Sequence, residues 1–136
     1  MNQVVKRKRK GFTLLELLLA SVILAVALSV LLLEFLSCAV LSEAARNLTR
    51  AVAHAQYVME DIKNTTFINI KSKIDNGDWD WDSADISNEG LTPLRNEIID
   101  TSVSGTDLLD VTVNVSWQNK GGRSQYTSLE TLIAEP

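Results

Sequence analysis

Glu16 is the residue most clearly expected to have a charged partner or a functional role. It lies near the start of an apolar segment, residues 12–33, in which no other residue is charged. A carboxylate inside a membrane-spanning segment costs about 2.5–3.5 kcal/mol to insert and is usually paired or functional. No basic residue follows before Arg46. A cut after Gly11 would supply a partner, because Phe12 would then carry a free α-amine that could neutralise Glu16 of a neighbouring copy.

A second group of residues has the chemistry of a calcium site. Carboxylates alternate with tryptophans in a polar, turn-rich stretch, and a further carboxylate stands twelfth when the first is counted as one. An EF-hand loop takes its ligands from positions one, three, five and twelve, among others. The candidate calcium ligands are therefore Asp78, Asp80, Asp82 and Glu89.

Two positions depart from the EF-hand pattern. Ser83 stands sixth, where the loop needs glycine for its sharp turn, and Asp85 stands eighth, where an apolar residue is expected. The alternative is a solvated acidic loop without calcium. Trp79 and Trp81 would then pack over a sheet or face a partner.

The rest of the chain offers little for catalysis. The sequence contains no evident nucleophile–base pair, metal cluster or phosphate-binding loop, so we expect a protein that is not an enzyme and that has no cofactor besides the calcium considered above. His54 is the single histidine and is predicted to lie on the surface. After residue 11, 8 Lys and Arg face 17 Asp and Glu, a net charge of −9 that argues against direct nucleic-acid binding.

The apolar segment has the length of a membrane span. Residues 12–33 would form a helix of about 33 Å, close to the hydrocarbon thickness of about 30 Å. The basic residues 6–10 precede it and are expected to stay in the cytoplasm, which places the rest of the chain across the membrane.

The helix is predicted to continue to about residue 65, with a change of character on the way. Apolar residues recur there at alternating spacings of four and three, which predicts one apolar face. That face could pack on the chain's own domain, which we favour, or on a second copy as a coiled coil. Its members are Leu41, Ala45, Leu48, Val52, Ala55, Met59 and Ile62.

The C-terminal part is predicted to be a small antiparallel sheet of about three strands over residues 97–134. One strand has a clear period of two, with Val111, Val113, Val115 and Trp117 on one face. Asn119-Lys120-Gly121-Gly122 is predicted to be a hairpin loop before a last strand over 126–134. Residues 71–94 are expected to be an acidic loop with at most a short helical turn.

The segment Lys10-Gly11-Phe12-Thr13-Leu14-Leu15-Glu16, with its basic leader and apolar run, resembles the N-terminus of type IV prepilins and type II secretion pseudopilins. The resemblance implies that a prepilin peptidase cuts between Gly11 and Phe12 and methylates Phe12. It also implies that Glu16 acts in filament assembly, with other pilins and an inner-membrane assembly platform as partners. The chain would start in the bacterial inner membrane, N-terminus inside and C-terminal domain outside, and then enter a pilus or pseudopilus.

A weaker resemblance concerns the subtype. The valine-rich strand, the glycine hairpin and the final strand resemble the end of V-type minor pilins and I-type minor pseudopilins. Many major pilins have a proline near the 22nd mature position, where this chain has Leu33 and Glu34, and this difference also favours a minor subunit. The implied fold is α+β and pilin-like, a long N-terminal helix packed on the sheet.

The resulting division is a cleaved leader (1–11), a transmembrane and filament-packing helix half (12–37) and an exported domain (38–136). Two simpler hypotheses for the N-terminus are a secretory signal cut after Ala25-Val26-Ala27 and an unprocessed anchor. The alternative function is a membrane-anchored extracytoplasmic binding module, calcium-dependent if the acidic loop binds the ion, which never polymerises.

Overall fold

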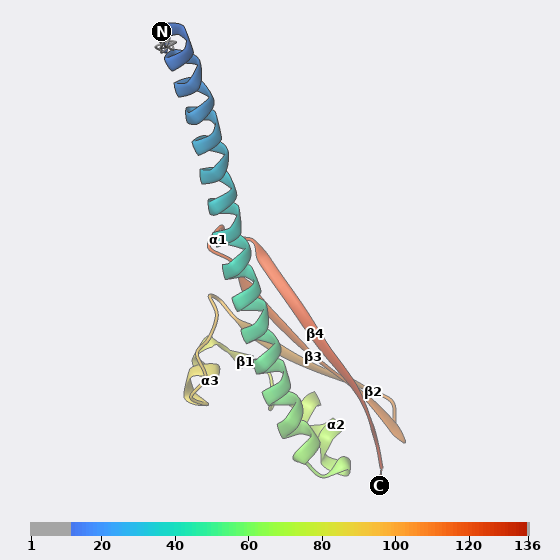
Figure 1. Cartoon of the computed structure of the whole chain (residues 1–136). Coiled ribbons are helices and arrows are strands. Elements are labelled where there is room, and N and C mark those ends of the chain that lie inside the picture. The colour runs from blue at the N-terminus through green and yellow to red at the C-terminus, as the bar shows by residue number, and fades with distance from the viewer. Residues whose placement is uncertain (1–11, 136) are drawn as a thin grey trace, which may run out of the picture. The chain divides into compact units, whose positions relative to one another are not determined.

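The computed structural model describes residues 12–135, so the basic leader and Gly11 lie outside the described residues. The described chain divides between Leu41 and Ser42 into two compact units. Its elements, labelled in Figure 1, are α1 (Leu14–Asn64), α2 (Phe67–Asp75), β1 (Trp81–Asp82), α3 (Ser83–Asn88), β2 (Ile98–Ser104), β3 (Leu108–Gln118) and β4 (Ser124–Ala134).

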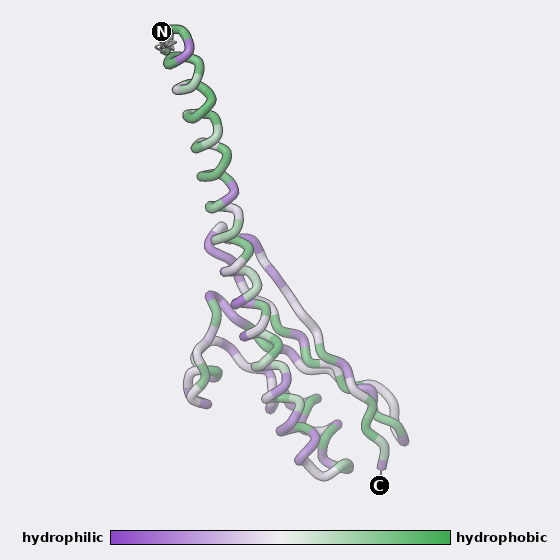
Figure 2. The backbone as a smooth tube through the Cα atoms, in the orientation of Figure 1, coloured by the Kyte–Doolittle hydropathy of each residue, from purple (hydrophilic) through white to green (hydrophobic). Residues whose placement is uncertain are grey.

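The first unit is the apolar half of α1. Its leucines, isoleucine, valines and phenylalanines are exposed to a large extent, and no part of the described chain covers them. The helix contains a stretch that is long and apolar enough to cross a membrane, and Figure 2 shows the apolar residues along this half. Such exposure in water is unfavourable, so this surface needs lipid or other helices around it.

The second unit packs the remainder of α1 on a four-stranded antiparallel sheet of order β1-β2-β3-β4. β3 is central, and its alternate residues Val111, Val113, Val115 and Trp117 are buried. They share one hydrophobic core with the buried residues of α1, which are mostly small or β-branched near the sheet. Ala51 and Ala55 of α1 are fully or almost fully buried in this core.

The predicted α+β layout is confirmed, but the sheet has four strands rather than about three. The additional strand, β1, is only two residues long and comes from the segment expected to be a loop. That segment also contains the end of α2 and the whole of α3. Tertiary contacts hold the segment of residues 71–94 in place. Trp79, for example, is buried and donates its indole N–H to Asp61 of α1 at 2.6 Å.

The predicted apolar face of the long helix is correct only toward its end. Ala55, Met59 and Ile62 are buried as expected, whereas Leu41, Ala45 and Leu48 are exposed, because burial on α1 begins at Ala51. The buried face is also wider than one seam and includes His54. The prediction that this histidine lies on the surface was therefore wrong, for a reason given below.

Gly105, in the turn between β2 and β3, generates the first prediction. It has φ +93°, and a Cβ built there would lie 2.0 Å from the carbonyl oxygen of Leu108. Gly105→Ala should therefore destabilise the sheet domain by more than the roughly 1–3 kcal/mol that a left-handed residue alone costs. Urea denaturation followed by tryptophan fluorescence measures the change.

Gly122→Ala is the matched control. Gly122 also has positive φ (+74°), but nothing lies within 4 Å of its added Cβ. This variant should lose only the conformational part, about 1–2 kcal/mol. Equal losses at Gly105 and Gly122 would contradict the clash.

Candidate functional site

The N-terminus of α1 carries the motif residues that the structure describes. Phe12 precedes the helix and is 81% exposed. Thr13 accepts the first helical hydrogen bond through its carbonyl, from the N–H of Leu17 at 3.1 Å. Its hydroxyl accepts from the N–H of Glu16 at 3.3 Å, and the Glu16 carboxylate accepts from the N–H of Thr13 at 3.5 Å.

These reciprocal bonds form a capping box, in which Thr13 is the N-cap and Glu16 the third helical residue. Glu16 therefore has a local partner that the sequence analysis missed, although the Thr-x-x-Glu spacing signals it. The positive end of the helix dipole also favours a carboxylate in the first turn. Both effects lower the cost of a carboxylate at this position before any neighbour is present.

The four candidate calcium ligands are distributed among different structural roles. Asp80 accepts hydrogen bonds from the N–H and hydroxyl of Thr101, at 2.8 and 2.9 Å. Asp82 is the N-cap of α3, and Glu89 accepts from the Tyr57 hydroxyl at 3.3 Å. Asp78 is exposed.

Asp82 caps the helix that follows it through one carboxylate oxygen, Oδ1. Its carboxylate accepts from the N–H groups of Ala84 at 2.7 Å and Asp85 at 3.1 Å, while Asp85 accepts from the N–H of Asp82. The backbone bonds from Asp85 and Ala84 hold the pKa of the Asp82 carboxyl below its usual value. The short α3 is thus fixed by its N-cap residue.

An open pocket of about 370 Å³ lies beside these residues, lined by Gly77, Asp78, Asp80, Trp81, Asp85, Asn88 and Glu89. Over residues 12–135, no three His, Cys, Asp or Glu side chains form a group that could hold a metal ion. Of the four predicted ligands, the pocket brings three together at its rim but excludes Asp82. Calcium binding stays a prediction from the sequence.

The most deeply buried polar contact joins α1 to the segment before β2. His54 Nδ1 lies 2.8 Å from Glu97 Oε1, and the two side chains are 5% and 0% exposed. A carboxylate accepts only, so Nδ1 is the nitrogen that carries the proton. The other carboxylate oxygen accepts from the N–H of Leu94 at 2.6 Å.

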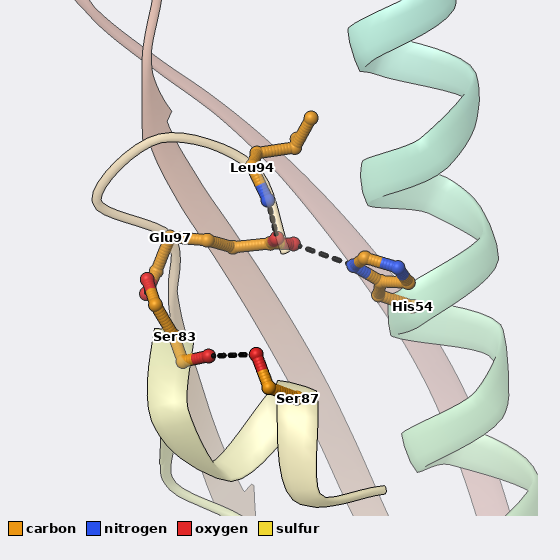
Figure 3. Close-up of polar contacts among 5 residues, drawn as sticks. All are labelled: His54, Ser83, Ser87, Leu94 and Glu97. Atoms are coloured by element: carbon orange, nitrogen blue, oxygen red, sulfur yellow. Dashed lines mark hydrogen bonds and ion pairs between the residues drawn. The ribbon is translucent and has the colours of Figure 1, made fainter. Parts of the chain in front are cut away.

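Figure 3 shows Glu97 between Leu94 and His54, with Ser83 and Ser87 on α3 below. The Ser83 hydroxyl donates to the Glu97 carbonyl at 3.1 Å and does not reach the imidazole. His54 and Glu97 therefore form a structural tie between α1, α3 and the sheet. His54 was predicted to be exposed because a histidine beside a 4–3 apolar seam gives no sign of a buried partner 43 residues away.

Trp81, which lines the acidic pocket, forms an aromatic pair with Tyr57. Tyr57 of α1 is 42% exposed, and its ring lies 6.1 Å from that of Trp81 between centroids. The negative charge of Glu89 raises the pKa of Tyr57 above its usual value, with smaller contributions from desolvation, from the hydrogen bond to Glu89 and from Asp61. The pair fixes β1 against α1.

The comparisons with known proteins concern the N-terminus. Residues 6–32 match the family described as the prokaryotic N-terminal methylation motif. No curated protein and no solved structure matches the chain. The matched residues include Gly11, Phe12 and Glu16, so the prepilin-type processing motif expected from the sequence is supported independently of the sheet domain.

His54→Ala should destabilise the sheet domain by about 3–5 kcal/mol, because it leaves a buried carboxylate without its charged or polar partner. His54→Gln, whose amide can still donate to Glu97, should recover part of that loss. Urea denaturation followed by the fluorescence of buried Trp79 and Trp117 measures both. A loss under about 1 kcal/mol for the alanine variant would contradict the tie.

Glu89→Gln should lower the pKa of Tyr57 toward its ordinary value, because the charge that disfavours the phenolate is removed. Because the pKa of Tyr57 is higher in the folded than in the unfolded chain, the protonated phenol stabilises the fold. This contribution is complete below the pKa of the unfolded chain and is lost as the pH rises through the pKa of the folded chain. Phenolate absorbance in a Tyr126→Phe background isolates Tyr57. An unchanged titration midpoint would show that Glu89 does not set it.

Proposed function

We propose that the chain is a minor subunit of a type IV pilus or a type II secretion pseudopilus, processed by a prepilin peptidase and assembled through α1. The observation that carries this proposal is the methylation motif over residues 6–32, continuous with an apolar helix that nothing in the described chain covers. The role that we propose is structural rather than enzymatic.

Processing would begin with insertion of the apolar half of α1, with the basic leader inside. The peptidase would then cut between Gly11 and Phe12, and Phe12 would be methylated. Phe12 stands outside the first helical turn and is exposed, so a peptidase can reach the bond before it without unwinding α1. The processed chain would wait in the membrane until it joins a filament.

Assembly would exchange one partner of Glu16 for another. In a single chain the carboxylate caps its own helix through Thr13, a long and weak contact at 3.5 Å. An amine at Phe12 of a neighbouring subunit is a charged partner and would bind the carboxylate more strongly in a low-dielectric environment. The weak bond between Thr13 and Glu16 would therefore satisfy the carboxylate in a single chain and be given up when the amine of a neighbouring subunit binds it.

The rival hypothesis is a membrane-anchored binding module that does not polymerise, and the open acidic pocket beside Trp81 favours it. A binding module of this kind would not require cleavage after Gly11. It would retain its leader and tolerate changes at Gly11 and Glu16.

Glu16→Gln is the variant that separates the two roles of this residue. Glutamine can occupy the third position of a capping box but carries no charge, so membrane insertion should persist while incorporation into filaments falls by about tenfold or more. Thr13→Ala removes the cap and keeps the charge, and it should assemble much better than Glu16→Gln. Quantitative immunoblots of membrane and sheared-filament fractions measure the partition.

Intact mass spectrometry of the same fractions tests processing separately. A chain that begins at Phe12 with one added methyl group supports a processed subunit. An intact leader in cells with active peptidase, together with normal behaviour of Glu16→Gln, would leave the anchored binding module.

A further inference from the structure

The two edges of the sheet are protected very differently. At one edge β1 has two residues and leads directly into α3. Where β1 does not continue, Asp80 accepts the free N–H of Thr101 in β2. A short edge strand, a covering helix and a side-chain cap are devices by which proteins prevent further strand pairing.

β4 forms the other edge and has none of these devices. It pairs with β3 along its whole length of 11 residues, from Ser124 opposite Gln118 to Ala134 opposite Leu108, without a bulge. It contains no Pro, Lys or Arg, and its only charge is Glu130. Half of its backbone N–H and C=O groups point away from β3, where residues 12–135 provide no neighbouring strand.

A groove accompanies this open edge. It has a volume of about 380 Å³ and lies between α1 and β4, lined by Gln56, Met59, Glu60, Lys63 and Leu129. The core-facing residues of β4, among them Leu129 and Ile133, are only half-buried, although they pack against the core. A further strand beside β4 would direct alternate side chains toward this groove and extend the apolar layer.

We propose that β4 accepts an extended segment of another protein as a fifth strand of the sheet. Backbone hydrogen bonds would supply the pairing, and apolar side chains at alternate positions would lie toward the Met59–Leu129 groove. The assembly role of α1 does not provide this contact, so the inference goes beyond the proposed function.

The outward face of the sheet specifies the charge of that segment. The strand register places Asp100, Asp110 and Glu130 on this face, and β2, β3 and β4 contain no Lys or Arg. Opposite charges on neighbouring strands stabilise a sheet, and like charges destabilise it. The incoming segment should therefore carry basic residues at its outward positions, one of them beside Glu130.

A second copy of this chain is a poor occupant. Two β4 strands in antiparallel pairing would be related by a two-fold axis perpendicular to the sheet. That axis would also reverse the direction of residues 42–64 of α1, which pack on the same sheet, although both copies would enter from one membrane. The pairing would in addition bring two acidic faces side by side.

The test uses the full chain in detergent micelles and an 11-residue capped peptide, in which valine alternates with lysine or threonine. Hydrogen–deuterium exchange of residues 124–134 should slow by about tenfold at saturating peptide, because the outward amides of β4 become bonded. Exchange in α3 should not change. A peptide with glutamate in place of lysine should bind about tenfold more weakly.

Thr131→Lys and Thr131→Val are the matched variants. Position 131 faces the core side at the open edge, so an inward lysine should abolish peptide binding while valine preserves it. Equal urea midpoints for the two variants show that the sheet itself is intact. If Thr131→Lys shifts that midpoint, Glu130→Gln replaces it and should reduce the preference for the lysine peptide over the glutamate peptide.

Three results would overturn the proposal. The first is unchanged exchange of residues 124–134 with every peptide. The second is equal protection by a peptide of the same composition whose valines are clustered instead of alternating. The third is protection that rises with protein concentration when no peptide is present, which would assign the edge to a second copy.

Discussion

The packing of α1 on the valines of β3 is the contact on which the sheet domain depends. Ala51 and Ala55 of α1 are buried in the same core as Val111, Val113 and Val115 of β3. Because β3 is central, this one layer supports both neighbouring strands. Trp79, Trp117 and Ile62 then close the core around it, so that short elements such as β1 and α3 can be held by very few contacts.

The same helix has to satisfy two different environments. Up to Leu41 its apolar side chains have no cover in the described chain, whereas from Ala51 onward one face is buried in the protein. A single chain in water would bear a large unfavourable exposure along the first part. Lipid and other helices are the environments that remove it, and in such surroundings the Glu16 carboxylate gains from the N–H that Thr13 donates to it.

The features that the sequence predicts are those with local or periodic signals. The basic-glycine-phenylalanine-glutamate spacing, the apolar span and the alternation in β3 each involve residues within a few positions of one another. β1, by contrast, depends on Trp79 bonding to Asp61 and Trp81 lying against Tyr57, contacts made only after the chain has folded back. His54 and Glu97 were missed for the same reason, since 43 residues separate them and neither lies in an apolar pattern. The Thr13–Glu16 box was visible in the sequence and was overlooked because the carboxylate was considered only as a membrane charge.

Eight acidic residues of the sheet domain fall into two groups that sequence alone does not separate. Asp61, Asp80, Asp82, Glu89 and Glu97 each accept a hydrogen bond from a specific group of the protein, and together they hold the segment between α2 and β2 in place. Their density produces the resemblance to a calcium loop, yet a carboxylate that caps a helix or a strand has an oxygen less to offer an ion. Asp100, Asp110 and Glu130 lie instead on the open face of the sheet, on or beside the strands that lead to the bare edge. Charges of the first group stabilise the fold, whereas those of the second lie on β2, β3 and β4, which contain no basic residue, and give this face of the sheet a negative charge.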